Sequence, residues 1–340
     1  MQHESEIDAK TGGSRFFRAD SPINQLDVAV LIPCYNEEKS IGFVVKDLRK
    51  VLPGAIVYVY DNNSSDRTVE EAREAGAVVG FETARGKGNV VRRMFGDVEA
   101  DIYILIDGNG TYQASAAPRL LETLISNSLD MVCGSRVEAV KTAYPPGHRF
   151  GNRILSGLVG KIFGNRTKDM LSGYRVFSRR FVKSFPALSR GFEIETELTV
   201  HALELRMPIV DVDTEYGERP PGSESKLSTV KDGFRIMRMI MLLVKEERPM
   251  QFFGAFAVLL ASVSLLLVYP VFAEYVETGL VPRLPTAVLS AAVMLMGLLS
   301  LFAGLILDTV TLGRREMKRL GYLRFESVGS ALRTRNKTLT

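Results

Sequence analysis

The sequence predicts an α/β protein in which a mostly parallel sheet is followed by an amphipathic interface helix and two transmembrane helices. In roughly the first two thirds, short apolar runs alternate with helical patterns, as in parallel sheets that are covered on both faces. In the last third, two uninterrupted apolar stretches are each long enough to cross a hydrocarbon core of about 30 Å. A basic amphipathic segment precedes them and fits a helix that lies in a membrane interface.

Six runs have the composition expected of buried strands. In chain order the runs are "DVAVLIP", "AIVYVYD", "AVVGFE", "DIYILID", "DMVCGSR" and "MPIVDVDTEY". Asp61, Asp107 and Arg136 are the charged residues that end the second, fourth and fifth runs. Because ligands of such sheets bind outside the carboxyl ends of the strands, we expect these three side chains in one crevice.

The segments between these runs have helical periodicity. We expect "NEEKSIGFVVKDLRKVL" to form a helix with Asn36 as its N-cap and acidic residues in its first turn. A second helix is expected in "SDRTVEEAREAG", closed by Gly76. The other predicted helices lie in "GKGNVVRRMFGDVEA", residues 116–127, "GHRFGNRILSGLVGKIFG" and "ETELTVHALELR".

The chain divides into five predicted regions. Residues 1–25 are polar and lack the apolar core of a signal peptide, so we interpret them as a mobile tail. The others are an α/β domain at 26–228, an amphipathic juxtamembrane helix at 229–249, a transmembrane hairpin at 250–312 and a basic tail at 313–340. A core-packed helix is the alternative for the juxtamembrane segment, and a buried hairpin is the alternative for the two apolar stretches. Because basic residues flank the outer ends of the hairpin, both termini and the α/β domain are predicted to be cytoplasmic.

Composition and charge narrow the classes of function. The net charge is +4 over 340 residues, and much of the Lys and Arg flanks the apolar C-terminal runs, which favours an anionic membrane surface over nucleic acid. Cys34 and Cys133 are the two cysteines, which form neither a disulfide framework nor a zinc pattern and fit a reducing compartment. The three histidines show no ligand spacing. A His/Cys metal site is therefore not expected.

Four motifs in this order carry a family resemblance: "PCYNEE", "DNNSSDRT", "ARGKGNVV" and "DGNGTY". Together with "DMLSGYRVF", "GFEIETEL" and "YGERPPGSESKL", they make the chain resemble the family 2 glycosyltransferases of GT-A fold. The resemblance runs from about Val28 to the second apolar stretch and is greatest to polyprenyl-phosphate glycosyltransferases, such as dolichol-phosphate mannose synthases and bacterial undecaprenyl-phosphate hexosyltransferases. It implies a membrane-bound inverting enzyme that moves a hexose from a nucleotide sugar to a polyprenyl phosphate. UDP-glucose is the favoured donor and GDP-mannose the second candidate.

The resemblance also implies a set of nucleotide-binding residues. They are Pro33, Tyr35, Asn36, Glu37, Asp61, Lys87, Asp107 and Gly108. Tyr35 can frame the base, and Asp61 can accept a hydrogen bond from an N–H of uracil or guanine. Lys87 lies between two glycines at a predicted helix start, where a phosphate can approach closely. The structural alternatives are a helix N-terminal acid for Glu37 and an Asx-turn for Asp61.

The stretch "LIDGNGTY" predicts a divalent-cation site with an unusual ligand. Mg²⁺ and Mn²⁺ are hard cations that take oxygen ligands and bridge a nucleotide diphosphate, and the family pattern here is Asp-x-Asp. This sequence has Asp107 but carries Asn109 at the second position, which supplies no negative charge. Either a carboxylate and an amide hold the cation, or Asn109 belongs to an Asn-Gly turn. We predict that Mg²⁺ or Mn²⁺ is still held through Asp107, with Asn109 as the second ligand.

Basic and hydroxyl side chains in later segments are predicted to bind the donor diphosphate and the lipid phosphate. They are Arg136, Arg153, Arg219, Ser223, Ser225 and Lys226. The guanidinium fork suits phosphate, and the alternative for each Arg is a surface salt bridge. Asp169 is expected either to orient the donor sugar or to pair with Arg175. Glu193 and Glu195 alternate, so both are expected on one strand face, as sugar ligands or as structural carboxylates.

The predicted catalytic residues are Asp107, Arg136, Asp169 and Arg219, and two rival functions stay open. A processive polysaccharide synthase resembles this fold, but such enzymes carry a Gln-x-x-Arg-Trp motif and this chain contains no Trp. A catalytically silent membrane scaffold that binds nucleotide sugar is supported only by Asn109. The resemblance further implies a homo-oligomer in a cytoplasmic membrane, with undecaprenyl or dolichyl phosphate as the acceptor.

Overall fold

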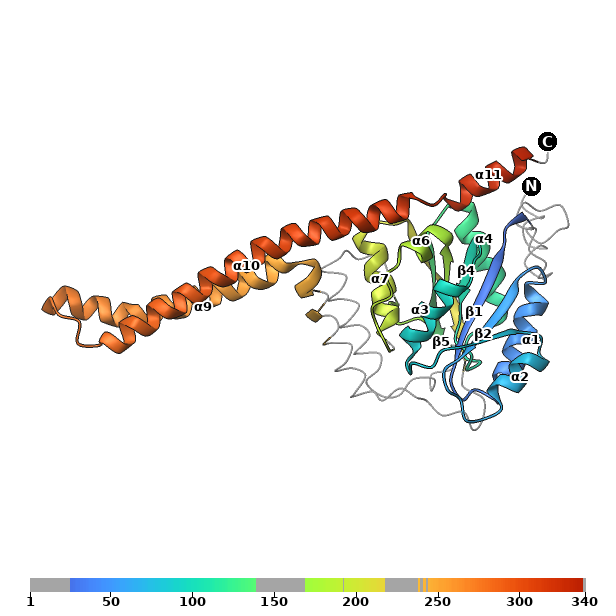
Figure 1. The fold of residues 1–340 in the computed structure, drawn as a ribbon, viewed down its shortest axis with the longest axis horizontal. Coiled ribbons are helices and arrows are strands. Elements are labelled where there is room, and N and C mark those ends of the chain that lie inside the picture. The colour runs from blue at the N-terminus through green and yellow to red at the C-terminus, as the bar shows by residue number, and fades with distance from the viewer. Residues whose placement is uncertain are drawn as a thin grey trace, which may run out of the picture. The chain divides into compact units, whose positions relative to one another are not determined.

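The computed structural model describes residues 25–138, 169–191, 193–217, 238, 241–242 and 244–338. Two compact units divide the chain: Met1–Ile236 together with Lys318–Thr340, and Met237–Met317. The first unit contains the sheet, and the second contains most of two long apolar helices (Figure 1). The predicted α/β class with two long apolar helices behind it is therefore confirmed.

The described residues form one seven-stranded sheet in the order β3-β2-β1-β4-β6-β5-β7. The strands are β1 (Val28–Cys34), β2 (Ile56–Asp61), β3 (Val78–Phe81), β4 (Ile102–Leu105), β5 (Met131–Glu138), β6 (Arg175–Ser178) and β7 (Ile209–Tyr216). Only β6 runs antiparallel to its neighbours, so the sheet is mostly parallel. The strand order reverses between β1 and β4, and ligands of open α/β sheets bind outside the carboxyl ends at such a point.

Helices cover both faces of the sheet (Figure 1). On one face lie α1 (Ile41–Val51), α2 (Thr68–Glu74), a short 3₁₀ turn at Ala114–Ala116 and α4 (Ala117–Ser126). On the other face lie α3 (Lys87–Asp97), α6 (Arg179–Ser184) and α7 (Ile194–Glu204). Alternation along β1 explains the two layers: Val28, Val30 and Ile32 join the first core, whereas Ala29 and Leu31 join the second.

The first helix begins later than the sequence analysis expected. Asn36 adopts a left-handed backbone conformation with φ of 52°, and its Oδ1 accepts a hydrogen bond from the Ser65 backbone N–H at 2.8 Å. The helix starts at Ile41, Ser40 is at the N-cap position, and the first turn contains no acidic residue. The prediction of Asn36 as N-cap is wrong because its side chain binds the neighbouring strand-end loop instead.

The second unit contains α9 (Pro249–Thr278) and most of α10 (Leu284–Leu323), which run antiparallel (Figure 1). The Ser264 hydroxyl donates to the Ser290 carbonyl at 2.7 Å, and the Ser300 hydroxyl donates to the Phe253 carbonyl at 3.0 Å. Both helices are long and apolar enough to cross a membrane, and only 17% and 22% of their most apolar windows are buried. A core helix of a soluble protein would be mostly buried, so these exposed apolar surfaces favour lipid as their surroundings.

The end of the chain packs on the sheet unit. The Tyr322 hydroxyl donates to the fully buried Asp130 carboxylate at 2.8 Å. Asp130 also accepts hydrogen bonds from the Ser178 hydroxyl at 2.7 Å and from two nitrogens of Arg180 at 2.5 and 2.8 Å. A buried carboxylate needs such a full set of donors because burial of an unpaired charge is costly.

A second set of contacts holds this C-terminal segment. Lys318 forms an ion pair with Glu204, the last residue of α7, at 2.7 Å. Val328 begins α11 (Val328–Thr338) and is buried in the core beside α1 and α4. Arg335 of α11 pairs with Asp101 at 2.9 Å. Much of the segment that the sequence analysis described as a basic tail is therefore ordered against the α/β unit.

Candidate active site

Two of the predicted nucleotide-binding residues meet directly beyond the carboxyl end of β4. The Lys87 Nζ lies 2.5 Å from Asp107 Oδ1 and 2.5 Å from Glu195 Oε1, so the ammonium bridges two carboxylates. The Lys87 and Glu195 side chains are 9% and 6% exposed, whereas Asp107 is 26% exposed. Asp107 is thus the member of this cluster that solutes can reach.

The charge state of the cluster follows from its surroundings. Burial by itself would lower the pKa of Lys87, but Asp107 and Glu195 outweigh burial and raise that pKa. Burial raises the pKa of the Glu195 carboxyl, and Lys87 opposes that rise. Lys87 is therefore a permanent cation at neutral pH.

Close backbone packing fixes the position of Lys87 at the start of α3. Gly86 has φ of +123°, which favours glycine. A Cβ on Gly88 would lie 2.8 Å from the Ser189 carbonyl carbon and 2.9 Å from that of Arg190, so a larger residue cannot fit without a backbone shift. The two glycines of the "GKG" motif are thus required by this close approach.

The Asn62 side chain holds the loop before Lys87 through three hydrogen bonds. Its Nδ2 donates to the carbonyls of Glu82 and Ala84 at 2.8 and 2.9 Å, and its Oδ1 accepts from the Gly86 N–H at 2.7 Å. All three bonds reach one loop, which places the "DNNSS" and "RGKG" motifs side by side. Asn62 is not among the predicted site residues, although it lies directly after Asp61.

Asp61 forms the Asx-turn that was the structural alternative, and its other carboxylate oxygen stays unpaired in the part of the chain that the structure describes. Its Oδ2 accepts from the Ser64 backbone N–H at 3.1 Å, which is the expected Asx-turn. Its Oδ1 is buried and has no hydrogen-bond partner among the described residues. A buried acceptor without a donor is costly, so Asp61 retains an oxygen that can bind an external N–H.

The other predicted residues of the "PCYNEE" motif lie at or just after the carboxyl end of β1. Pro33 lies in β1 opposite Tyr60, and Tyr35 is 38% exposed just after the strand. Glu37 is largely buried; its backbone N–H donates to the Thr68 hydroxyl at 2.8 Å, and its carbonyl accepts the first hydrogen bonds of α1. These contacts give the Glu37 backbone a structural role before α1, and the nucleotide-binding role of its side chain stays a prediction.

Asn109 is engaged within its own turn. Its Oδ1 accepts hydrogen bonds from the Thr111 backbone N–H at 3.0 Å and from the Thr111 hydroxyl at 2.6 Å. Asn109 is 6% exposed, and Gly110 follows it with φ of 74°. An amide oxygen has two lone pairs, and Thr111 uses both. Asn109 therefore stabilises an Asn-Gly turn, as the structural alternative held.

These contacts decide how a divalent cation fits. Among the described residues, no group of three or more His, Cys, Asp or Glu side chains could hold a metal ion. Mg²⁺ often binds one or two carboxylates together with substrate phosphates, and Asp107 meets that need. Asn109 would have to release Thr111 before it could coordinate. The residues present therefore fit a cation held by Asp107 and donor phosphates, rather than one held by two protein ligands.

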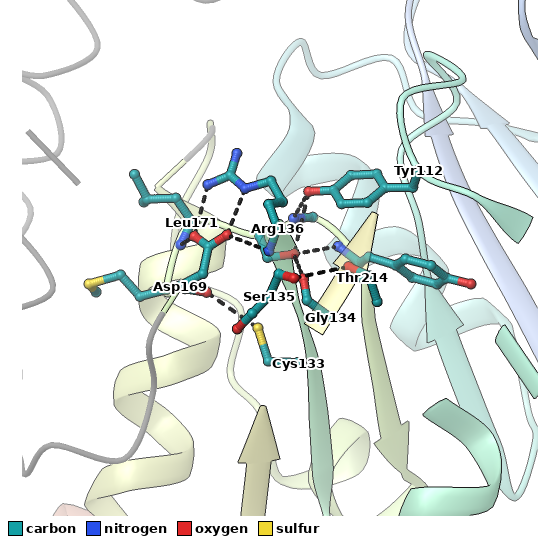
Figure 2. Close-up of polar contacts among 12 residues, drawn as sticks. Tyr112, Cys133, Gly134, Ser135, Arg136, Asp169, Leu171 and Thr214 are labelled. Atoms are coloured by element: carbon teal, nitrogen blue, oxygen red, sulfur yellow. Dashed lines mark hydrogen bonds and ion pairs between the residues drawn. The ribbon is translucent and has the colours of Figure 1, made fainter. Parts of the chain in front are cut away.

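Arg136, in the last part of β5, forms a bidentate ion pair with Asp169 (Figure 2). The distances are 2.7 Å from Nε to Oδ2 and 2.8 Å from Nη2 to Oδ1. The guanidinium also lies 5.5 Å from the centre of the Tyr216 ring. Asp169 therefore balances much of the charge on Arg136 and fixes its orientation.

The alternative in which Asp169 pairs with Arg175 is wrong. Arg175 is fully buried and donates to the Ser172 and Met170 carbonyls at 2.9 and 2.6 Å and to the Thr199 hydroxyl at 2.9 Å. The β5–β6 ladder ends where Cys133 lies opposite Arg175. The rest of β5 extends beyond that ladder, and this extension carries Arg136 to Asp169.

A tyrosine and a glycine outside the predicted site complete the surroundings of Asp107. The Tyr112 hydroxyl accepts from the Gly173 N–H at 2.9 Å and lies 3.4 Å from the Ser172 hydroxyl. A Cβ on Gly173 would lie 2.6 to 2.8 Å from the three carboxylate atoms of Asp107. On the other side of the loop, the Ser40 hydroxyl donates to the Gly108 carbonyl at 2.7 Å. Tyr112 and Gly173 both occur in motifs that carry the family resemblance, and these motifs could have indicated that the two residues belong to the site.

The prediction that Glu193 and Glu195 share a strand face is wrong. Glu193 is at the N-cap position of α7 and Glu195 lies in its first turn. Residues two apart on a helix do not face each other, and Glu195 turns to Lys87. Glu193 has a buried Oε2 without a hydrogen-bond partner among the described residues. The alternation of the two glutamates was compatible with a strand or with a helix. The residues that follow, as far as Glu204, have a helical pattern, and the structure has a helix there.

Several predicted residues lie outside the part of the chain that the structure describes. They are Arg153, Arg219, Ser223, Ser225 and Lys226. The predicted N-terminal tail and most of the predicted interface helix at 229–249 also lie there. These assignments stay predictions.

The chain is similar to several known proteins. Residues 29–185 match the family Glycosyl transferase family 2. Glycosyltransferase AglJ of Haloferax volcanii is 34% identical over 296 residues, which cover 86% of this chain and 97% of that protein. A dolichyl-phosphate hexose transferase of the same organism is 28% identical over 222 residues, which cover 65% of this chain and 96% of that protein.

Solved structures support the same fold. Glucosyl-3-phosphoglycerate synthase from Mycobacterium tuberculosis, in complex with Mn²⁺, UDP and glucosyl-3-phosphoglycerate, matches with a TM-score of 0.54 and 20% identity. The match covers 66% of this chain and 81% of that chain. At this identity the likeness concerns the fold, and it agrees with the mostly parallel sheet described above.

Proposed function

The chain belongs to glycosyl transferase family 2, and from that premise we propose that it moves a hexose from a nucleotide sugar to a polyprenyl phosphate at a membrane. It is a glycosyltransferase by family. The proposal concerns its donor, its acceptor and its membrane setting. The observation that carries it is the meeting of Lys87 and Asp107 beyond β4, close to the strand-order reversal, in a chain with two long apolar helices.

A nucleoside-diphosphate sugar is the donor that suits this part of the sheet edge. Asp61 keeps a buried oxygen for a base N–H, and Lys87 supplies a fixed positive charge. The solved relative of the same fold holds UDP and Mn²⁺, which supports a diphosphate donor and Mn²⁺ or Mg²⁺ as cofactor. We favour UDP-glucose and take GDP-mannose as the second candidate, since Asp61 can serve uracil or guanine.

A polyprenyl phosphate is the acceptor that the relatives and the apolar helices favour together. One relative is named dolichyl-phosphate hexose transferase. A polyprenyl chain stays in the bilayer, and α9 and α10 are apolar enough to hold the enzyme there. We propose that the α/β unit and both termini are cytoplasmic, and that undecaprenyl or dolichyl phosphate is the acceptor. A homo-oligomer stays a prediction.

The reaction needs charge neutralisation more than proton transfer. A phosphate-monoester oxygen of the acceptor attacks C1 of the sugar, the new C1–O bond forms, and the C1–O bond to the diphosphate breaks with inversion. The nucleoside diphosphate leaves with the electron pair. The second pKa of a phosphate monoester is about 6, so the acceptor is largely ionised at neutral pH and needs no general base.

The described residues can meet these needs by position and charge. Lys87 supplies a fixed positive charge beside Asp107, and Asp169 holds Arg136 in one orientation. Mg²⁺ or Mn²⁺ bound through Asp107 would supply further positive charge to the leaving diphosphate. Arg219 stays the predicted fourth catalytic residue. Preorganised charges of this kind are a main source of rate enhancement in enzymes.

The proposal is tested by product identification. Membranes that contain the full chain are mixed with undecaprenyl phosphate, Mn²⁺ and either UDP-glucose, GDP-mannose or UDP-N-acetylglucosamine, and the lipid extract is analysed by mass spectrometry. We expect a hexosyl-phosphoryl lipid with one donor, no product from Asp107→Asn, and equal or greater activity from Asn109→Asp. Absence of lipid product from both the wild type and Asn109→Asp would overturn the proposal and favour the silent scaffold.

A further inference from the structure

The contact between Lys87 and Glu195 has a consequence for how Asp107 binds a cation. We propose that Glu195 is a positioning residue that holds the Lys87 ammonium between two carboxylates and thereby sets the affinity of Asp107 for the divalent cation. The inference rests on the proposed function, because it assigns a role at the same diphosphate site.

The geometry makes Lys87 and a divalent cation competitors for one carboxylate. The ammonium lies 2.5 Å from Asp107 Oδ1, and Asp107 is the exposed member of the cluster. A divalent cation that approaches Asp107 therefore meets a positive charge already paired with it. Like charges repel strongly at such separations because protein weakens their interaction less than water does.

Glu195 changes the outcome of this competition. With Asp107 alone, Lys87 would form a neutral pair, and the cation would have to break it. With Glu195 at the same 2.5 Å distance, the ammonium stays paired when Asp107 turns to another cation. Formal charges of −1, −1 and +1 leave the cluster at −1. Asn109 adds no charge to this sum, so Glu195 is the carboxylate that keeps Lys87 paired when Asp107 binds a cation.

The surroundings keep this arrangement fixed. Gly86 and Gly88 pack against the backbone of Ser189 and Arg190, and the loop before them is fastened by Asn62. The Lys87 ammonium therefore cannot follow Asp107 freely if that carboxylate moves. Preorganisation of this kind is what makes a fixed charge effective at a diphosphate.

An unpaired oxygen supports a role for Glu195 beyond a simple ion pair. Glu195 Oε2 is buried and has no hydrogen-bond partner among the described residues. Leaving a buried carboxylate oxygen unpaired lowers the stability of the fold. A purely structural salt bridge gives no reason for this cost, whereas a carboxylate needed to hold the Lys87 ammonium does. With 6% of its side chain exposed, Glu195 is also a poor direct ligand for a sugar.

The test measures Mn²⁺ binding rather than turnover. Purified full-length protein in detergent with saturating UDP is titrated with Mn²⁺, and free Mn²⁺ is followed by electron paramagnetic resonance. Three variants are compared with the wild type: Glu195→Gln, Lys87→Met and the double variant. Glu195→Gln keeps the shape of the side chain, and circular dichroism checks that each variant is folded.

The expected pattern has opposite signs for the two single variants. Glu195→Gln should raise the Kd for Mn²⁺ by about tenfold, because Lys87 then pairs with Asp107 alone. Lys87→Met should lower the Kd, because the competing ammonium is gone, even though transfer slows. The double variant should match Lys87→Met within about twofold, since Glu195 then has no ammonium to hold.

Other patterns overturn the inference. An unchanged Kd in Glu195→Gln would exclude a role for Glu195, and a large further change in the double variant would mean that Glu195 does not act through Lys87. The absence of Mn²⁺ binding to the wild type with UDP would also refute it. The readout needs no product. The expected Mn²⁺ pattern without any lipid product would therefore overturn only the proposed acceptor or donor.

Discussion

Gly173→Ala is the most direct perturbation of Asp107 that leaves Asp107 itself in place. The Gly173 N–H donates to the Tyr112 hydroxyl at 2.9 Å, and the turn faces the Asp107 carboxylate. A methyl group at residue 173 would lie 2.6 Å from Oδ2 and 2.8 Å from Cγ and Oδ1. No left-handed backbone conformation is involved, so the effect of the substitution comes from this contact alone.

The structure gives the size of the effect. Ordinary contact begins near 3.4 Å, so the carboxylate must move by roughly 0.7 Å. A side chain turned away from its preferred rotamer costs about 0.5–1.5 kcal/mol. Misplacement of a catalytic group by about 1 Å can lower a rate by about 10²-fold, which corresponds to about 2.7 kcal/mol of transition-state stabilisation. We therefore expect a large loss of activity with a small loss of stability.

The assay follows transfer of labelled sugar to lipid phosphate over a range of Mn²⁺ concentrations, and circular dichroism follows thermal unfolding. We expect kcat to fall by about 10²-fold, with the free energy of unfolding changed by less than about 1.5 kcal/mol. Gly96→Ala is the matched control. Gly96 lies in α3, and nothing lies within 4 Å of the point that an alanine methyl group would occupy, so alanine should stabilise the helix by about 0.5–1 kcal/mol and leave activity unchanged.

Two results would refute this reasoning. Wild-type activity and Mn²⁺ dependence in Gly173→Ala would mean that the position of the Asp107 carboxylate does not matter. A loss of activity matched by unfolding of the protein would mean that Gly173 serves only the fold.

Three further predictions address the fold around the site. Gly88→Ala should destabilise the protein by about 1–3 kcal/mol and abolish transfer, because its methyl group would meet a backbone carbonyl; normal melting and activity would contradict this. Burial lowers the pKa of His201 to about 3, from an ordinary value of about 6.5. Between these two pH values, His201 binds a proton in the unfolded chain but not in the folded chain. The free energy of unfolding should fall by about 1.4 kcal/mol per pH unit from pH 6.5 toward 3 through this residue; an unchanged slope in His201→Gln, measured by urea unfolding between pH 6.5 and 5, would exclude it. Tyr322→Phe should cost about 1.5–3 kcal/mol because buried Asp130 loses a donor, and unaltered urea unfolding would show that the C-terminal segment contributes little.

The sequence was informative wherever a structural feature depends on residues that are close together along the chain. The alternation of apolar runs with helical patterns predicted the sheet, because a buried strand and an amphipathic helix each have a distinct period. Asp61 and Asp107 could be placed at strand ends for the same reason, and the structure has them there. The Asn-Gly turn at Asn109 was also a local alternative, and its hydrogen bonds to Thr111 span two residues.

Errors arose where a local pattern did not fix the conformation by itself. Asn36 has the side chain of a good N-cap, yet the loop at Ser65 provides its partner. The alternation of Glu193 and Glu195 fitted a strand, but the residues that follow continue a helix. In both cases a partner or an element further along the chain decided the conformation.

The sequence by itself determined the class of fold, the two apolar helices and the strand ends that carry acidic residues, since short-range periodicity encodes all three. Only the tertiary structure decided which charges meet. Lys87 and Glu195 are 108 residues apart, and Asp130 and Tyr322 are 192 apart. Nothing local marks such pairs, because a buried charge takes its partner from whichever segment the packing of helices on the sheet brings within reach.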